Sequence, residues 1–211
     1  LTGPRDAGKI RSLVCFDRNT GRELWHHDVP FPDKETAHND NPFCSGSPTT
    51  DGRLVYASFG SAGIVACDFT GKVAWHRKLG RLAHVFGPAT TPVLYKDLLI
   101  FHMDGRDVQY VVALDKKTGE PVWRTEREEK SNWATPFVWE NEIRTEIVTP
   151  GTGKFRSYDL NGKLLYEFGG GSSITIAAPY SKFGLLFVSS GYVLDRKKPL
   201  FAIRPGASGD I

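Results

Sequence analysis

The chain has 211 residues with 22 glycines and 13 prolines, and its 27 Lys and Arg residues exceed its 24 Asp and Glu residues by only three. Because the basic residues are spread along the chain, they do not form the concentrated footprint of a nucleic-acid-binding protein. No apolar stretch approaches the length that spans a membrane. The length allows a sizeable core, and the abundant Gly and Pro favour a turn-rich all-β protein.

One short phrase recurs along the chain. It occupies residues 15–25, 66–75 and 113–123, returns in a looser form at 157–166, and leaves a remnant at 201–206. Its aspartates are separated by 51, 47 and 44 residues, and Arg204 stands 45 residues after the last of them. The aspartates are Asp17, Asp68, Asp115 and Asp159. Self-similarity at this period predicts a repeat architecture.

Short strands are predicted between the copies of the phrase. Four segments rich in β-branched and aromatic residues indicate strands, at 54–59, 98–101, 144–148 and 185–188. Each follows a proline that keeps the same period, namely Pro48, Pro92, Pro136 and Pro179. A unit of about 45 residues then holds about four short strands, which is the content of one propeller blade. The repeat units are expected near 11–29, 47–79, 90–127, 134–168 and 177–211.

Within the phrase, the aspartate ends a strand and its carboxylate is expected to accept hydrogen bonds from the amides of a turn. A glycine then reverses the chain with a positive φ, at Gly21, Gly71, Gly119 and Gly162. The next strand carries one large aromatic residue per unit, at Trp25, Trp75, Trp123 and Tyr166. We expect these rings to lie between neighbouring blades, where they bury much area. The alternative is a ladder of aromatics on which a ligand stacks.

The phrase Ala-x-Asp-x-x-Thr-Gly-x-x-x-Trp resembles the tryptophan-docking repeat of the pyrroloquinoline-quinone (PQQ)-like β-propellers. The copy at 66–75 lacks one residue of that spacing, and the copy at 157–166 has Tyr166 in place of Trp. This superfamily includes quinoprotein alcohol and glucose dehydrogenases, BamB-like outer-membrane assembly lipoproteins, and many exported proteins. The segments 52–60 and 201–206 look most like the exported propellers of planctomycete-type bacteria.

The resemblance implies an all-β propeller of four-stranded antiparallel blades. The motif position occurs five times, which does not match closure by four blades, and five full blades need more residues than 211. We therefore expect an arc of four to five blades from a larger propeller, of six to eight blades in the parent. The open edges of such an arc favour self-association through exposed strands.

Quinoprotein alcohol dehydrogenases carry two adjacent cysteines over the quinone, a calcium site of Glu, Asn and Asp, and a catalytic Asp. In this chain Cys15, Cys44 and Cys67 are far apart in sequence, and no acidic cluster has the spacing of a calcium loop. We therefore predict no catalytic residue and no resident cofactor. PQQ with calcium belongs only to the alternative, in which the chain is part of a quinoprotein oxidoreductase. A carbohydrate-active propeller is a third interpretation, because loop aromatics stack on sugars.

The remaining chemistry-bearing residues favour structural interpretations. Cys15 and Cys67 occupy nearly equivalent repeat positions and are expected to be buried strand residues. His26 and His27 are neighbours on a strand and point to opposite faces, so no metal site is predicted there. The mixed-charge run at 124–130 is expected to be a solvated loop.

A binding face is predicted where the chain passes from one blade to the next, at residues 26–47, 76–91, 124–135 and 167–178. Polar groups that converge with aromatic rings are typical of binding sites. The alternative for each single residue is an ordinary loop position that satisfies its own blade. The candidates are His38, Asn39, Asn41, Phe43, His84, Phe86, Asn132 and Trp133. The first connection is the longest and least regular, and long loops on a rigid scaffold often carry function.

Together these observations predict a non-catalytic propeller that serves as a binding or scaffolding module. Its partner is expected to be a protein or another cell-envelope ligand, with no nucleic acid and no membrane span. A periplasmic or secreted location follows from the family resemblance alone.

Overall fold

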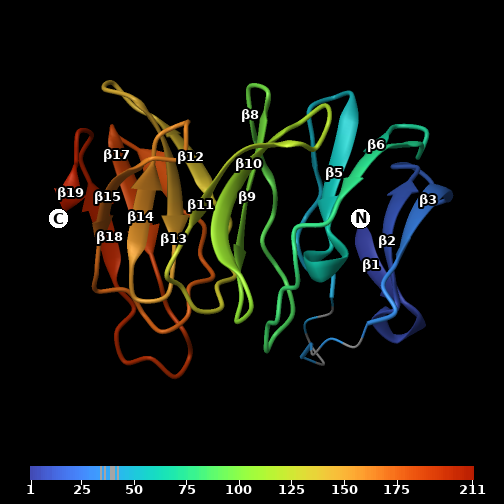
Figure 1. Cartoon of the computed structure of the whole chain (residues 1–211), viewed down its shortest axis with the longest axis horizontal. Helices are drawn as coiled ribbons and strands as arrows, with labels where there is room; N and C mark the ends of the chain where they lie inside the picture. Colours follow the sequence, from blue (N-terminus) through green and yellow to red (C-terminus); the bar gives the residue numbers. More distant parts are fainter. Residues whose placement is uncertain (34, 36, 39–40, 42) are drawn as a thin grey trace.

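The computed structural model describes residues 1–33, 35, 37–38, 41 and 43–211. Over this part of the chain the protein is built of short strands and two single-turn 3₁₀ helices, Asp6–Gly8 and Gly60–Ala62. The strands form five sheets that follow one another in chain order along the molecule (Figure 1). The predicted all-β fold is confirmed, and the four predicted strands correspond to β5, β9, β13 and β17.

Each sheet is one blade, complete in the middle of the described chain and partial at both ends. Blade 1 has three strands, β1 (Thr2–Arg5), β2 (Ile10–Phe16) and β3 (Glu23–Pro30). Blade 2 has β4 (Thr49–Thr50), β5 (Leu54–Ser58), β6 (Ile64–Asp68) and β7 (Val73–Arg77). Blade 3 has β8 (Val93–Tyr95), β9 (Leu98–Asp104), β10 (Gln109–Asp115) and β11 (Pro121–Glu126).

Blade 4 has β12 (Phe137–Glu140), β13 (Thr145–Pro150), β14 (Phe155–Tyr158) and β15 (Leu164–Phe168). Blade 5 has β16 (Tyr180–Lys182), β17 (Leu185–Ser189) and β18 (Leu200–Ile203). A two-residue strand, β19 (Gly209–Asp210), adds to the outer edge of blade 4 in parallel with β15, whereas the other pairings of named strands are antiparallel. No feature of the repeat predicts this parallel addition.

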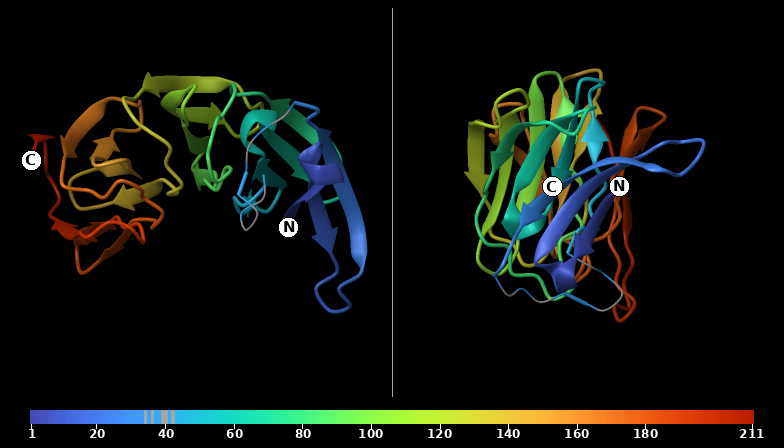
Figure 2. Two further views of the ribbon diagram at one scale, coloured as in Figure 1. Left: turned by 90° about the horizontal axis from the view of Figure 1, so that it is seen from below. Right: turned by 90° about the vertical axis from the view of Figure 1, so that its right-hand side faces the viewer.

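The blades form an open arc rather than a closed ring. Figure 2 (left) shows the N-terminus at one end of the arc and the C-terminus at the other. The first strands of blades 2 to 5 are neighbours along its inner edge, where β4 contacts β8, β8 contacts β12 and β12 contacts β16. The structure is therefore a partial propeller, as the repeat count predicts.

The core consists of apolar layers between blades rather than one central cluster. Strand β9 is buried on both faces, so its residues alternate between two layers. Leu99 and Phe101 pack with Tyr56 and Ile64 of blade 2. Ile100, which stands between these two residues in the sequence, points to the other face and packs with Ile147 of blade 4. Each blade therefore depends on its neighbours for burial, which explains why a repeat of this kind stabilises an array.

The turns that join β2 to β3, β6 to β7, β10 to β11 and β14 to β15 are nearly identical, and we call them the outer turns (residues 17–22, 69–72, 116–120 and 159–163). In the third of them, Oδ1 of Asp115 accepts hydrogen bonds from the amides of Lys117 and Thr118, each at 2.9 Å. Gly119 then takes a φ of 72°, a conformation that residues with a Cβ resist. The same arrangement recurs around Asp17, Asp68 and Asp159.

Each outer turn of blades 2 to 4 receives the tryptophan of the preceding blade. Nε1 of Trp25 donates to the carbonyl of Phe69 at 2.8 Å, and Trp75 and Trp123 donate to Lys116 and Leu160 at 3.0 and 2.8 Å. A Cβ atom on the turn glycine would collide with the ring, at 2.8 Å for Gly71 and 2.5 Å for both Gly119 and Gly162. These are the tryptophan-docking repeats that define this class of propeller.

Tyr166 departs from this pattern. Its ring is buried in the apolar layer between blades 4 and 5 with Trp139, Leu186 and Ile203. Its strand neighbour is Gly209 of the parallel strand β19, not a turn of blade 5. Burial raises the pKa of its hydroxyl above the ordinary range. The position still joins two blades, but through burial alone.

Candidate binding face

The described residues of the connections between blades lie along the lower edge of the molecule in Figure 1, on the side opposite the outer turns. We call them the blade connections (residues 31–48, 78–92, 127–136 and 169–179). They surround an open, mostly apolar cavity of about 370 Å³. Its lining residues are His38, Asn41, Phe86, Ala89, Trp133, Ile174, Ile176 and Tyr192. This cavity is thus lined by side chains from all four blade connections and by Tyr192 from the loop between β17 and β18, which we call the hairpin loop of blade 5.

The cavity wall is a row of rings in edge and tilted contact. The centroid of Phe86 lies 5.6 Å from the ring of His38 and 5.5 Å from that of Trp133. Nε1 of Trp133 donates to the carbonyl of Gly87 at 2.8 Å. Nδ2 of Asn41 donates to the carbonyl of Phe86. These bonds tie neighbouring connections together and fix the ring orientations.

Two of the predicted site residues lie beneath the cavity instead of lining it. His84 is 4% exposed and packs against Trp133 with ring centroids 5.0 Å apart. Asn132 is 1% exposed; it donates to Oδ2 of Asp104 at 3.0 Å and to the carbonyl of Pro150 at 2.6 Å. Burial lowers the pKa of His84 below its ordinary value, although bonds to two carbonyls act against that shift. Both residues position the wall.

The other candidates from the first connection are placed differently. The ring of Phe43 faces the buried guanidinium of Arg11, with 5.1 Å from Cζ to the centroid, and does not line this cavity. Asn39 lies outside the described residues. The structure therefore brings His38, Asn41, Phe86 and Trp133 to one cavity.

A buried ionic network supports the connections, and sequence reasoning missed it. Asp104, at the end of β9, lies 3.0 Å from Nδ1 of His102 and 3.4 Å from Nη2 of Arg127. All three side chains are fully buried. Burial acts to raise the pKa of Asp104, but the charges of Arg127 and His102 outweigh it and hold that pKa below its ordinary value. A buried carboxylate needs such compensation.

The network corrects the prediction that residues 124–130 form a solvated loop. Arg127 and Glu129 have side-chain exposures of 0% and 1%. Glu129 accepts from Arg127 at 3.3 Å, from Arg156 of blade 4, and from the amide of Thr152 at 2.8 Å. Because alternate residues of the extended chain point inward, Arg127 and Glu129 face blade 4. The two-residue alternation was the signal, but only the neighbouring blade shows which charges it buries.

A second cavity of about 450 Å³ adjoins the first and shares Phe86, Trp133 and Ile174 with it. Its remaining lining is mainly polar and includes Arg106, Gln109, Glu129, Lys130, Ser131 and Ser173. The two cavities meet along one wall of the binding face.

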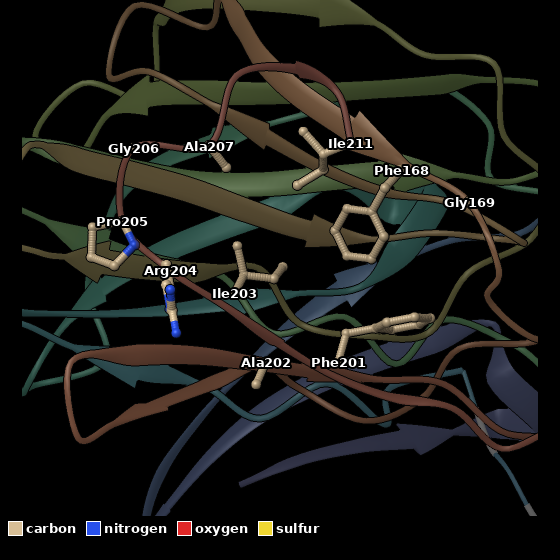
Figure 3. Close-up of a pocket in the computed structure, with 10 residues that line it drawn as sticks. All are labelled: Phe168, Gly169, Phe201, Ala202, Ile203, Arg204, Pro205, Gly206, Ala207 and Ile211. Carbon is tan, nitrogen blue, oxygen red and sulfur yellow. The ribbon is translucent and has the colours of Figure 1, made fainter.

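A further cavity, of about 540 Å³, lies elsewhere, between β15, β18 and the segment up to Ile211 (Figure 3). Phe168, Phe201 and Ile203 surround it, and the ring of Phe201 lies 5.2 Å from that of Phe168. Arg204 is the one charged residue of its lining. This open space lacks the converging polar groups that are typical of a binding site.

The described residues do not fit a quinone and calcium. The three cysteines carry free thiols in different blades and connections, so no adjacent pair exists. Cys15 and Cys67 lie on β2 and β6 as expected; Cys67 is buried, which raises its pKa to about 11, whereas Cys15 is only partly buried, contrary to the expectation. Within the described ranges, no three His, Cys, Asp or Glu side chains gather as a metal-binding group. No catalytic step is therefore derived through such a cofactor.

Comparison with known proteins places the chain in a family. The family profile described as "Outer membrane protein assembly factor BamB" matches residues 10–167, which is more than half of the chain. The chain therefore belongs to this family of PQQ-like β-propeller repeat proteins. Over its described residues, no helix has the length and hydrophobicity to cross a bilayer.

Individual relatives are distant. The chain is 28% identical over 129 residues to the quinoprotein ethanol dehydrogenase of Pseudomonas putida, covering 55% of this chain and 20% of that protein. The structure resembles BamB from Moraxella catarrhalis with a TM-score of 0.62 and 14% identity, over 90% of this chain and 57% of that one. It also resembles the quinohemoprotein alcohol dehydrogenase of Comamonas testosteroni, with a TM-score of 0.57, 13% identity, and coverage of 91% and 38%. The chain thus spans about a fifth of its curated relative, and the structural likenesses show the fold alone.

Proposed function

We propose that this propeller is a non-catalytic binding or scaffolding module of the cell envelope, and that it engages a protein partner through the face formed by its blade connections. The observation that carries the proposal is the cavity lined by all four blade connections. A rigid scaffold that holds loop residues in a shared concave site is a common design for recognition.

Two further findings support this proposal. The family profile that matches the chain carries the name of an outer-membrane assembly factor, which supports a cell-envelope role. The described residues lack the adjacent cysteines and the metal-binding group that quinone chemistry in this superfamily requires. The match to the dehydrogenase covers only a fifth of that enzyme, so it does not carry the enzyme's activity over to this chain.

The proposal is tested by site-specific photo-crosslinking in cells that make the full-length protein. A photoreactive residue replaces Ile176, which is 58% exposed at the cavity rim. The matched control replaces Phe183, which is 84% exposed in the hairpin between β16 and β17, outside the cavity lining. We expect a defined envelope protein to be crosslinked from position 176 and not from position 183.

Two results would contradict the proposal. One is the same set of adducts from both positions, which would mean that the face has no selective partner. The other is stoichiometric binding of PQQ in the presence of calcium with dye-linked oxidation of an alcohol or sugar, which would establish the oxidoreductase alternative.

A further inference from the structure

The two adjoining cavities of the binding face differ in chemistry. The first is walled by Phe86, Trp133, Ile174 and Ile176 and has few polar atoms on its surface. The second carries Arg106 and Lys130 next to hydroxyl and amide groups. Since Phe86, Trp133 and Ile174 belong to both linings, an apolar group and a charged group of one ligand can occupy them side by side.

No described residue neutralises the cations of the second cavity. Arg106 and Lys130 are exposed, and neither side chain has an ion-pair or hydrogen-bond partner among the described residues. Some other surface cations do have partners, such as Arg81 with Asp107 at 3.5 Å and Lys117 with Asp97 at 3.6 Å.

The carboxylate in the lining of the second cavity, that of Glu129, is already paired with cations of the protein. Glu129 is compensated by Arg127 and Arg156, and its second oxygen accepts from Thr152. Its side chain is only 1% exposed. The net charge offered to a ligand in this cavity is therefore positive.

The hairpin loop of blade 5, residues 190–199, extends the same pattern. Tyr192 lines the apolar cavity, and the loop is held against it because Asp195 accepts from the amide and hydroxyl of Ser173, at 2.8 and 2.9 Å. Arg196 and Lys197 follow on the exposed side of this loop, again without a side-chain partner among the described residues.

Building on the proposed function, we propose that the two cavities form one bipartite site for an acidic peptide segment, whose aromatic or branched aliphatic anchor enters the apolar cavity while neighbouring carboxylates pair with Arg106 and Lys130. Charge complementarity selects the acidic flanks, and the ring-lined pocket selects the anchor. A sugar fits less well, because its hydroxyl groups need partners that the apolar lining does not supply.

The test is a fluorescence anisotropy titration of the full-length protein with the labelled peptide Gly-Glu-Asp-Phe-Glu-Asp-Gly. One comparison peptide has Ser in place of Phe, a second has Lys in place of every acidic residue, and an oligogalacturonate serves as an acidic sugar. We expect the acidic Phe peptide to bind at least about ten-fold more tightly than the Ser peptide, because the Ser peptide has no ring to bury in the apolar cavity. Its affinity falls with added salt, since screening shortens from about 10 Å at 0.1 M to about 3 Å at 1 M.

Variants assign the site. Arg106→Gln and Lys130→Gln should each weaken the acidic Phe peptide by about two- to five-fold, as for exposed charge pairs. The double reversal R106E/K130E should shift the preference to the Lys peptide. The matched control is Lys163→Glu, an exposed lysine in the outer turn of blade 4, which should leave binding unchanged. Ile176→Ser tests the anchor cavity at an exposed position that folding does not depend on.

Every outcome separates this inference from the proposed function. Equal binding of the acidic and basic peptides, equal loss in the Lys163→Glu control, or tighter binding of the oligogalacturonate would overturn the inference. If an envelope protein is still crosslinked from position 176, the proposed function stands without it. If the peptide preference holds but no envelope protein is crosslinked, the bipartite chemistry stands and the envelope partner is wrong.

Discussion

The outer turns and the blade connections lie on opposite faces of the same arc and behave differently. Each outer turn of blades 2 to 4 repeats one set of contacts, an aspartate that accepts from the turn and a glycine that receives a tryptophan ring. The blade connections repeat a contact near their ends, where the amide of Ser47 donates to the hydroxyl of Thr91 and the amide of Thr91 donates to that of Thr135, but the contacts of their cavity-lining side chains differ from one blade to the next. One contributes the ring of Phe86, another Trp133 and a buried ion pair through Arg127.

This difference explains why the sequence reveals the architecture more readily than the binding face. A contact that every blade needs for stacking is constrained at each repeat, so it produces the recurring phrase. A contact made once by one connection has no such constraint, so it leaves no periodic signal. The regular face maintains the architecture, and the irregular face is free to carry a ligand.

The largest expected effect comes from the support beneath the irregular face. Asp104→Asn removes the charge that compensates Arg127. Breaking a buried pair leaves an uncompensated charge, so we expect a loss of about 3 kcal/mol in the free energy of unfolding. Chemical denaturation of the wild type and of Asp104→Asn measures this difference in unfolding free energy. The control Asp97→Asn breaks an exposed pair with Lys117 and should change stability by under about 1 kcal/mol; equal effects would contradict a stabilising role for the buried network.

The same variant has a pH signature. Because the pKa of Asp104 is held below its ordinary value, its contribution is fully present above the pKa of an unfolded Asp, about 3.9. It is lost as the pH falls below that value through the lower folded pKa. We therefore expect the unfolding free energy of Asp104→Asn to fall less steeply than that of the wild type on acidification below about pH 4, and parallel curves would contradict the assignment.

The regular face is tested by one pair of glycines. Gly119 and Gly21 have nearly the same φ, 72° and 70°, but a Cβ on Gly119 meets Trp75 at 2.5 Å and a Cβ on Gly21 meets nothing within 4 Å. Both Gly→Ala variants carry the backbone penalty, about 1–2 kcal/mol. Gly119→Ala should cost about 1–3 kcal/mol more because the ring must move. Thermal or chemical unfolding that gave equal losses would mean that docking adds nothing to the turn.

A smaller effect is expected within the wall of the binding face. Trp133→Phe keeps an aromatic ring in the cavity but removes the bond from Nε1 to the carbonyl of Gly87. We expect a loss of about 0.5–1.5 kcal/mol in the unfolding free energy, as for one intramolecular hydrogen bond. If Trp133→Phe lowered the unfolding free energy more than Gly119→Ala does, the cavity wall would contribute as much to stability as the outer turns. That result would remove the contrast between the two faces.

The smallest effect on stability is expected at the rim. Ile176 is exposed at the cavity mouth, so Ile176→Ser should change the unfolding free energy by less than about 0.5 kcal/mol. Peptide binding measured on the same sample should nevertheless weaken. A stable variant with unchanged binding would exclude the apolar cavity as the ligand site.

Much of the fold could be predicted from local sequence. The strand at 54–59, the glycine of the turn at Gly119 and the ring at Trp123 follow from residue chemistry at a fixed period. The parallel addition of Gly209–Asp210 to β15 could not be predicted, because two residues carry no strand signal and the pairing depends on where the chain passes blade 4. Tyr166 likewise occupies the predicted position but lacks the bond that Trp25, Trp75 and Trp123 make, since among the described residues its hydroxyl has no hydrogen bond to a carbonyl of blade 5.

The candidate site was predictable only in outline. The sequence alone determined the repeat, the all-β architecture, and the loops where a ligand face would lie, because these follow from turn chemistry and alternation along a single strand. Only the tertiary structure decided that Phe86 and Trp133 share a wall, that His84 and Asn132 lie beneath it, and that Arg127 and Glu129 are buried while Arg106 and Lys130 stay open. The physical reason is that burial and charge compensation depend on the neighbouring blade, and residues on neighbouring blades are about 45 positions apart in the chain.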